Sequence, residues 1–396
     1  MIEAYLLDWA NLLLRWAHVV TAIAWVGSSF YFVFLDSSLV PPADDKLRGD
    51  GATGELWAVH GGGFYHPVKY AVQPPQLPAH LHWFYWESYS TWLTGFGLFT
   101  VMYLWNAGTF LVDRNLLDWP PFAAGFAAVL SLYVFWTLYN QACKSFGERE
   151  NGDAIVGAIV LVLVVIASWA ACRVFAGRAA FVIVGAMLAT AMSANVLFWI
   201  IPGQRKVVAA IQAGETVDPI HGARGKQRSV HNTYFTLPVL FAMLSNHYSF
   251  TGSSHNWLVL VLMMFAGAAI RQFFVLRHGW KLGRNRHPLP YAIAGVVVIA
   301  AVIAGLWPAA SPPVSQQATY AQVQQVIAQR CVQCHGAQLQ MKNIRLDSPQ
   351  ALKQHAQQVY EQAVVAKTMP LNNATQITDA ERALIGRWFE AGAPLQ

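Results

Sequence analysis

The chain has 396 residues, of which 55% are hydrophobic and only 12% are charged. A soluble domain carries about 25% charged residues, so this composition excludes an ordinary soluble protein and predicts one that crosses a membrane several times. The formal net charge is +6, but the basic residues lie in short loops between apolar runs. That distribution indicates membrane topology and argues against a nucleic-acid partner. The N-terminus lacks the basic segment of a cleavable signal peptide.

Apolar runs of about 20 residues, the length that crosses a bilayer core, recur along residues 1–307. They predict an all-α, polytopic membrane helical bundle of about eight spans, which we interpret as the catalytic domain. The predicted spans are 9–35, 85–105, 119–140, 154–175, 179–201, 232–248, 257–276 and 289–307. Residues 308–317 are rich in proline and predict an extended linker. Residues 318–396 are polar and predict a small separate domain.

The segment between the first two spans, residues 36–84, is far longer than a simple connector, which favours a binding or active-site segment. It contains His60-Gly-Gly-Gly-Phe-Tyr-His66 and His80-Leu-His82, and Glu87 follows at the start of the next span. Ionisable residues inside spans are costly and indicate function by default, which applies to His18 and Glu87. A structural role is the alternative, because histidines and aromatic residues near span ends are often interfacial.

Cys331-Val-Gln-Cys334-His335 is the attachment sequence of a c-type haem. Both cysteines would form thioethers to the porphyrin, and His335 would ligate the iron. We expect Met369 as the second axial ligand, because Met341 follows His335 too closely to reach the opposite haem face. His/Met ligation suits electron transfer. The alternatives are half a zinc site, which would want a second cysteine pair, and a thioredoxin-like pair, which would want a βαβ context.

The region around this motif predicts a small class I cytochrome c. One helix is expected over residues 319–328, and a terminal helix is expected to begin at Thr378. Thr378 and Glu381 form the pattern of a capping box. Ile385 and Trp388 lie on the apolar face that would pack on the first helix. The porphyrin would supply the apolar bulk that so short a domain lacks.

Two independent features predict the orientation. Covalent haem attachment requires the C-terminal domain outside the cytoplasm, and an even number of spans then places the N-terminus outside too. The fifth and seventh loops should lie inside, and they carry most of the basic residues, as the positive-inside rule requires. These residues are Arg205, Lys206, Arg224, Lys226, Arg228, Arg277, Lys281, Arg284 and Arg286. In a bacterial inner membrane, the N-terminus and the cytochrome domain would be periplasmic.

Three stretches of the predicted membrane domain resemble the membrane-bound urate oxidases (urate hydroxylases) of bacteria. They are Trp16-Ala-His18-Val-Val-Thr-Ala-Ile-Ala-Trp25-Val-Gly27, His82-Trp-Phe-Tyr-Trp-Glu87-Ser-Tyr-Ser-Thr-Trp-Leu-Thr-Gly95, and residues 231–248, which begin His231-Asn-Thr-Tyr. That family fuses such a domain to a cytochrome c with a Met-Pro-Leu-Asn-Asn stretch, which matches residues 369–373. The resemblance covers essentially the whole chain. It implies oxidation of urate to 5-hydroxyisourate in purine breakdown, with electrons passed to a cytochrome c or terminal oxidase instead of to oxygen.

Urate is planar and anionic, so its site should combine aromatic stacking with arginine or amide donors and a base. We hypothesise that Glu87 or His231 is the base and that Asn232 and Arg228 orient the purine. His82 would lie beside Glu87 in the same pocket, at the cytoplasmic ends of the spans.

A bilayer core is ~30 Å thick, too far for one efficient electron hop from that pocket to an external haem. A b-type haem held by His18 and His247 would bridge the gap, although structural histidines would look the same in sequence. Two other function classes stay open. One is a respiratory subunit that oxidises quinol or another donor. The other is a transporter or sensor with a redox switch, which would favour internal repeats that the sequence does not clearly show.

Overall fold

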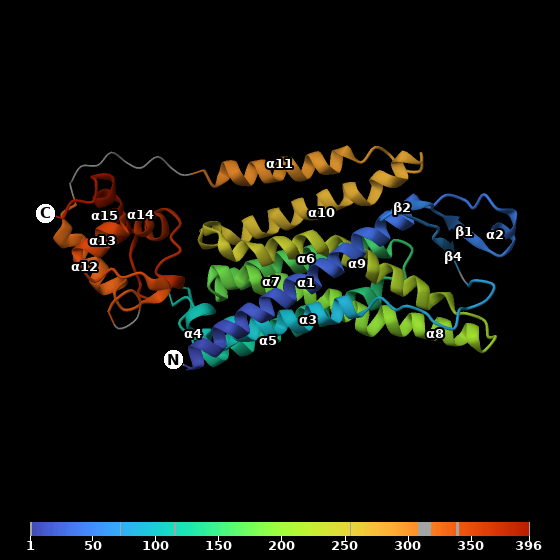
Figure 1. The fold of residues 1–396 in the computed structure, drawn as a ribbon, viewed down its shortest axis with the longest axis horizontal. Coiled ribbons are helices and arrows are strands. Elements are labelled where there is room, and N and C mark those ends of the chain that lie inside the picture. The colour runs from blue at the N-terminus through green and yellow to red at the C-terminus, as the bar shows by residue number, and fades with distance from the viewer. Residues whose placement is uncertain are drawn as a thin grey trace.

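The computed structural model describes residues 2–71, 73–114, 116–253, 255–307, 318–337 and 340–395. The protein is 71% helical, in agreement with the predicted helical character. A long bundle of helices forms most of the molecule, and a smaller helical domain lies at one end of it (Figure 1). The predicted linker, residues 308–317, lies outside the described residues.

Each of the eight apolar segments predicted from the sequence is helical at its core. The bundle helices are α1 (Ile2–Ser38), α3 (Trp86–Phe99), α5 (Pro121–Phe146), α6 (Gly152–Val174), α7 (Gly177–Asn195), α9 (Pro219–Leu244), α10 (Asn256–Lys281) and α11 (Leu289–Gly305). A π-helical turn (Thr100–Leu104) extends α3, and another (Val196–Ile200) joins α7 to α8 (Ile201–Gln212). The short α4 (Ala107–Phe110) precedes α5.

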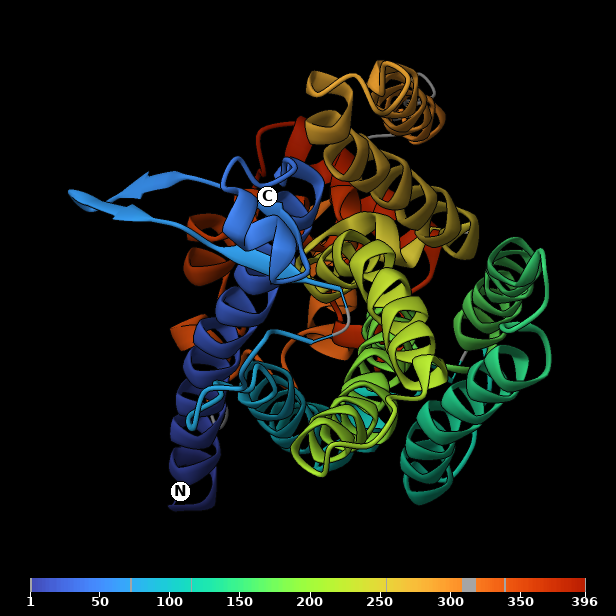
Figure 2. The same ribbon diagram turned by 90° about the vertical axis from the view of Figure 1, so that its right-hand side faces the viewer.

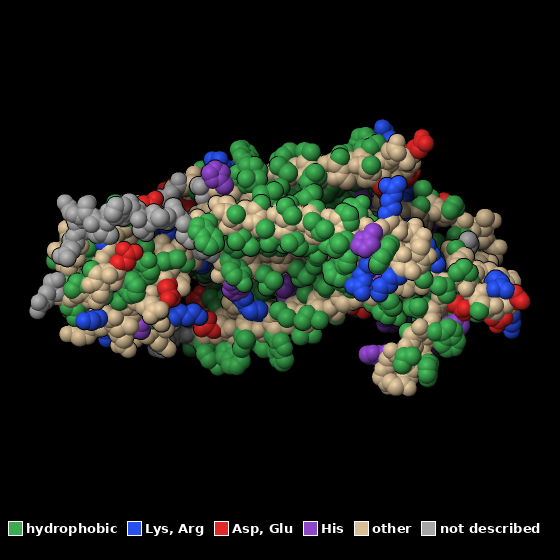
Figure 3. Space-filling model, turned by 90° about the horizontal axis from the view of Figure 1, so that it is seen from above, with side chains coloured by type: hydrophobic (Ala, Val, Ile, Leu, Met, Phe, Trp, Pro, Cys, Tyr) green, Lys and Arg blue, Asp and Glu red, His purple; other side chains and the backbone are tan. Residues whose placement is uncertain are grey.

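Five helices in the described part of the chain are long and apolar enough to cross a membrane, whereas eight spans are predicted. They are Tyr5–Ser38, Pro121–Phe146, Gly152–Val174, Gly177–Gln212 and Asn256–Lys281. Helix α11 is apolar but shorter, and the first half of α9 is rich in basic and polar residues. The surface over the bundle is largely hydrophobic (Figure 3). Length and composition thus support a membrane protein.

The fifth predicted loop is wrong, because its basic residues belong to helices. Arg205 and Lys206 lie in α8, and the later basic residues of this loop lie in α9. Helix α9 starts early because Pro219 occupies its first position and the Asp218 carboxylate accepts a hydrogen bond from the Ile220 N–H at 2.9 Å. Helix α8 and the start of α9, which carry these basic residues, therefore extend beyond the other helices of the bundle (Figure 1).

The all-α expectation is wrong for the long segment after α1. It contains α2 (Asp45–Gly49) and two antiparallel pairs of strands, β1 (Ala52–Glu55) with β4 (Val68–Tyr70) and β2 (Ala58–His60) with β3 (Gly63–Tyr65). This hairpin projects sideways from the end of the bundle (Figure 2).

The glycines of the histidine-rich stretch form the tip of this hairpin. Gly61 and Gly62 have φ values of +58° and +80°, and a two-residue hairpin turn of type I′ needs positive φ at both positions. His66 pairs with the buried Glu55 at 2.7 Å. These residues therefore shape the hairpin. Strands of three or four residues are too short to be predicted from the sequence pattern.

The C-terminal domain has its own core. It contains α12 (Tyr320–Arg330), α13 (Pro349–Gln354), α14 (Ala356–Val359) and α15 (Asp379–Glu390). The predicted capping box of Thr378 and Glu381 is confirmed. The predicted packing of the first helix against the last is also confirmed, since Val323 and Ile327 of α12 share one hydrophobic cluster with Ile385 and Trp388 of α15. A different cluster holds the bundle together.

Candidate functional site

Cys331, Cys334 and His335 lie together on the turn that follows α12. The backbone N–H groups of Cys334 and His335 donate hydrogen bonds to the Cys331 carbonyl at 3.1 and 3.0 Å. Both cysteines are free thiols. The two thiols and the imidazole thus belong to one short turn, which is the arrangement that covalent attachment of a haem requires.

The orientation of His335 suits an axial ligand. Its Nδ1 lies 3.3 Å from the Ile344 carbonyl oxygen, which favours the proton on Nδ1 and leaves the lone pair of Nε2 for a metal. Burial raises the pKa of the Cys331 thiol to about 11. Among the described residues, no group of three or more His, Cys, Asp or Glu side chains is placed to hold a metal ion, so the turn fits haem thioethers better than a zinc site.

Met369 lies on a loop that a buried arginine fixes. Arg382 is 6% exposed, and its Nη1 donates hydrogen bonds to the carbonyl oxygens of Met369, at 2.7 Å, and Ala363. The competing Met341 donates its backbone N–H to the Cys334 carbonyl at 3.1 Å. Met341 therefore starts from the same turn as the predicted proximal histidine, which favours Met369 as the ligand on the opposite face.

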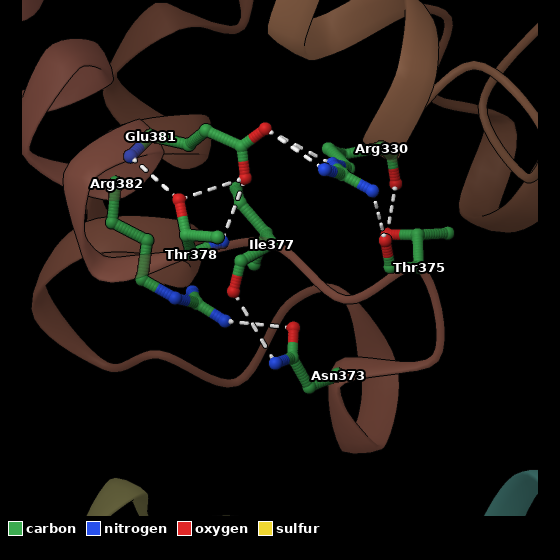
Figure 4. Close-up of polar contacts among 7 residues, drawn as sticks. All are labelled: Arg330, Asn373, Thr375, Ile377, Thr378, Glu381 and Arg382. Atoms are coloured by element: carbon green, nitrogen blue, oxygen red, sulfur yellow. Dashed lines mark hydrogen bonds and ion pairs between the residues drawn. The ribbon is translucent and has the colours of Figure 1, made fainter. Parts of the chain in front are cut away.

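Polar contacts connect the two predicted ligand loops (Figure 4). Arg330, at the end of α12, pairs with Glu381 of α15 at 3.0 Å and donates to the Thr375 carbonyl at 2.6 Å. The Thr375 hydroxyl returns a hydrogen bond to the Arg330 carbonyl at 2.9 Å. The segment after Met369 is thereby tied to the helix that ends at Cys331, so the chain itself holds both ligand loops in place.

The Met369 loop faces the bundle. The 3-10 turn η7 (Leu371–Asn373), which directly follows Met369 and Pro370, packs against α4. Helix α4 lies at the end of the bundle where α1 begins (Figure 1). The part of the C-terminal domain predicted to supply the second iron ligand therefore contacts the bundle.

A buried polar network joins α5, α7 and α9 and contains three of the predicted catalytic residues. Arg228 donates to Asn195 Oδ1 at 3.1 Å and to Asn140 Oδ1 at 2.9 Å. Asn195 donates to Asn232 Oδ1 at 2.9 Å. Asn232 donates to the Met192 carbonyl at 3.0 Å. Arg228 and Asn232 thus bind protein groups, where the sequence predicts contacts to a purine.

His231 completes this network. The Tyr139 hydroxyl accepts a hydrogen bond from Asn195 at 2.8 Å and lies 2.8 Å from His231 Nδ1. The Tyr139 hydroxyl and His231 Nδ1 therefore share one hydrogen bond, whose direction depends on the tautomer of His231. Arg228, His231 and Asn232 therefore lie together as predicted, in an arrangement that holds three helices together.

Glu87 and His82, the other predicted catalytic residues, have different surroundings. Glu87 is half-buried in the first turn of α3, and its neighbour Ser88 lies 3.2 Å from Ser193 of α7. His82 is exposed, with its ring 4.6 Å from that of Phe84. Among the described residues, no hydrogen bond joins Glu87 or His82 to the His231 network.

The two histidines predicted to share a membrane haem also contact different elements. His18 packs against α3, where its Nδ1 lies 3.1 Å from the Thr91 carbonyl oxygen. A Cβ added at Gly95 would lie 2.7 Å from the His18 ring, so α3 needs a glycine there. His247 is exposed in the 3-10 turn η3 (Ser245–His247) after α9. The structure does not bring the predicted pair together.

Comparison with known proteins decides what kind of bundle this is. A family model described as urate oxidase N-terminal matches residues 4–306. The chain belongs to this family. The match covers the whole bundle and ends before the C-terminal domain. Membership indicates a role in urate metabolism and an oxidoreductase activity. No match was found among curated proteins or among solved structures.

For a member of a urate oxidase family, one residue that the sequence analysis missed becomes important. Arg271 lies inside α10 and is fully buried. Its signal in the sequence is a single arginine inside the predicted span 257–276, and a charge inside a span is a functional candidate by default. Arg271 thus places a buried cation inside the bundle.

Proposed function

We propose that the protein is a membrane-bound urate hydroxylase that oxidises urate to 5-hydroxyisourate. In this proposal Cys331 and Cys334 bind haem c covalently, with His335 and Met369 as axial ligands of the iron. The observation that carries the proposal is a contact within one chain. A bundle of the urate oxidase N-terminal family meets, at α4, the loop that holds the predicted methionine ligand.

The reaction balances without molecular oxygen. A C5–O bond forms between urate and the oxygen of one water, and urate plus water give 5-hydroxyisourate, two protons and two electrons. Haem c supplies a one-electron carrier when bound, so each turnover needs two successive transfers. An external cytochrome c or a terminal oxidase is the acceptor that restores the oxidised protein.

We place the N-terminus and the C-terminal domain in the periplasm, with the bundle in the bacterial inner membrane. The N-terminus and the C-terminal domain lie at the same end of the bundle (Figure 1), which agrees with an even number of crossings. Lys and Arg side chains gather near the opposite end (Figure 3). An excess of basic residues at the cytoplasmic face is the expected bias for this orientation.

A b-type haem in the membrane stays part of the proposal through His18. The Thr91 carbonyl beside Nδ1 orients the ring as metal-ligating histidines are oriented, with Nε2 available. His18 lies within α1, between the two ends of the bundle, where a relay would shorten the transfer across the ~30 Å core. The second ligand predicted for it, His247, lies beyond the end of α9.

The stoichiometry of anaerobic turnover tests the proposed function. Purified protein in detergent, given urate and oxidised cytochrome c without oxygen, is expected to reduce two cytochromes for each urate consumed and to release 5-hydroxyisourate. Hydrogen peroxide should not form when oxygen is admitted. A reaction that requires oxygen and releases one peroxide per urate would contradict electron transfer to a cytochrome.

A further inference from the structure

Arg271 is a buried cation whose hydrogen bonds are incomplete. Its Nε lies 3.3 Å from the Thr233 carbonyl oxygen, and its Nη2 lies 3.5 and 3.4 Å from the carbonyl and hydroxyl oxygens of Ser29. Its Nη1 is buried and has no hydrogen-bond partner in the described part of the chain. Charge-assisted bonds of this kind are ordinarily about 2.7–2.9 Å long, so the guanidinium is poorly satisfied by the protein alone.

The protein also provides no counter-charge for Arg271. None of the ion pairs formed among the described residues includes it. A buried charge is costly unless it is paired and hydrogen-bonded. Arg228 is also buried and also has no ion pair among the described residues, but its guanidinium is satisfied because it donates to two asparagine side chains. Arg271 therefore lacks what an anionic ligand would supply.

A pocket lies beside this guanidinium, between α1 and α10. Its volume is about 280 Å³, and its walls include Arg271, Arg277, His278, Phe30, Phe34 and Phe274. Ligand pockets usually measure ~300–1,000 Å³, so this one lies just below that range and has room only for a small molecule. Its lining residues belong to the last turns of α1 and the second half of α10, and these two helices end on the side of the bundle away from the C-terminal domain (Figure 1).

The walls of the pocket define the chemistry of its ligand. Arg271 and Arg277 favour an anion, and no carboxylate lines the pocket in the described part of the chain. The guanidinium carbon of Arg271 lies 3.5 Å from the centre of the Phe30 ring, and Phe30 meets Phe274 edge to face at 5.9 Å. Aromatic walls with an arginine fork favour a flat anion of oxopurine size over a compact, strongly hydrated one.

A second pocket is a weaker candidate. It measures about 450 Å³ and lies between α8 and the segment after the hairpin, with Arg205 and His80 among its lining residues. Arg205 is exposed to solvent, so water can satisfy its guanidinium and no buried donor is left without a partner. The unsatisfied nitrogen distinguishes the pocket at Arg271.

We infer that the pocket between α1 and α10 is the urate-binding site and that Arg271 is its anion-binding residue. The inference rests on the proposed function and adds its substrate site. The unpartnered Nη1 donates to the negatively charged edge of the purine, and the phenylalanines provide the apolar walls. This position lies on the proposed cytoplasmic side, the compartment in which urate is produced.

Binding of radiolabelled urate to the dithionite-reduced protein tests this inference, because the reduced protein can bind urate without oxidising it. Arg271→Lys keeps the charge but loses the planar fork, and Val33→Trp fills the pocket while leaving Arg271 intact. Each is expected to weaken urate binding by at least about tenfold, in keeping with a lost hydrogen bond to a charged group. Arg205→Lys, the matched control in the second pocket, should bind like the unmodified protein.

Three outcomes have distinct meanings. Loss of binding in both pocket variants, with normal size-exclusion behaviour and an unchanged haem c spectrum, supports the site. Unchanged binding in both variants, or loss only in Arg205→Lys, overturns this site and leaves urate oxidation standing. If the unmodified protein binds no urate, both the site and the proposed function fail.

Discussion

Replacing Met369 with histidine is expected to lower the reduction potential of the protein by an amount on the order of hundreds of millivolts. A thioether ligand stabilises ferrous haem, whereas a second imidazole stabilises the ferric state. The loop should accept the change, because Arg382 holds the Met369 carbonyl and the side chain is 37% exposed. Potentiometric titration of the purified protein measures the shift, and reduction by urate should become slow or incomplete.

Met341→His is the matched control. Met341 is 54% exposed, and its backbone binds the turn of the predicted proximal ligand, so its replacement should leave the potential within the error of the titration. If Met341→His shifts the potential and Met369→His does not, the axial ligand has been assigned to the wrong methionine.

Asn195→Ala is expected to destabilise the bundle by about 3 kcal/mol. Asn195 is fully buried and makes hydrogen bonds to Arg228, Asn232 and Tyr139. Truncating it leaves the Arg228 guanidinium with one asparagine fewer and leaves Tyr139 without a donor, in a place that water does not reach. A clearly lower midpoint of thermal unfolding in detergent is the expected result.

Asn151→Ala serves as the control for this prediction. Asn151 precedes α6, is exposed and makes no capping hydrogen bond with its side chain, so its loss should leave the unfolding midpoint unchanged. An Asn195→Ala protein of normal stability that binds urate much more weakly would contradict this account. It would indicate that the network binds the purine, as the sequence predicts.

Local patterns of the sequence predict the C-terminal domain well. The Thr378 and Glu381 capping box and the apolar face of Ile385 and Trp388 follow from residues close together in the chain, and the apolar faces of α12 and α15 then predict that these two helices pack together. The Cys331-Val-Gln-Cys334-His335 motif is five residues long, and the haem attachment that it indicates stays a prediction. These features depend on short-range geometry, which periodicity and capping patterns express directly.

The substrate region was harder to predict, because hydrogen-bond partners come from distant helices. Arg228 stands in a basic stretch and Arg271 inside an apolar span, and neither position tells from sequence which groups the guanidinium will contact. Their difference is that Asn140 and Asn195 lie beside Arg228, whereas Ser29 and Thr233 offer Arg271 only long contacts. Only the packing of the helices shows which guanidinium is satisfied.

The long segment after α1 shows another limit of sequence patterns. Strands of three or four residues are too short to show a clear alternation of polar and apolar positions. The Gly61-Gly62 pair was the available signal, because two adjacent glycines suit the turn of a hairpin. Because histidines flank these glycines, the sequence favoured a binding loop over a hairpin turn.

The central claim is that urate delivers electrons to the C-terminal haem. The most direct test is an anaerobic absorption spectrum of the oxidised protein before and after urate is added, with no other acceptor present. The proposed function predicts reduction of a c-type haem together with formation of 5-hydroxyisourate, and a b-type band would reveal the relay at His18. A haem that stays oxidised with urate but is reduced by a quinol would contradict the claim and identify a respiratory electron-transfer subunit.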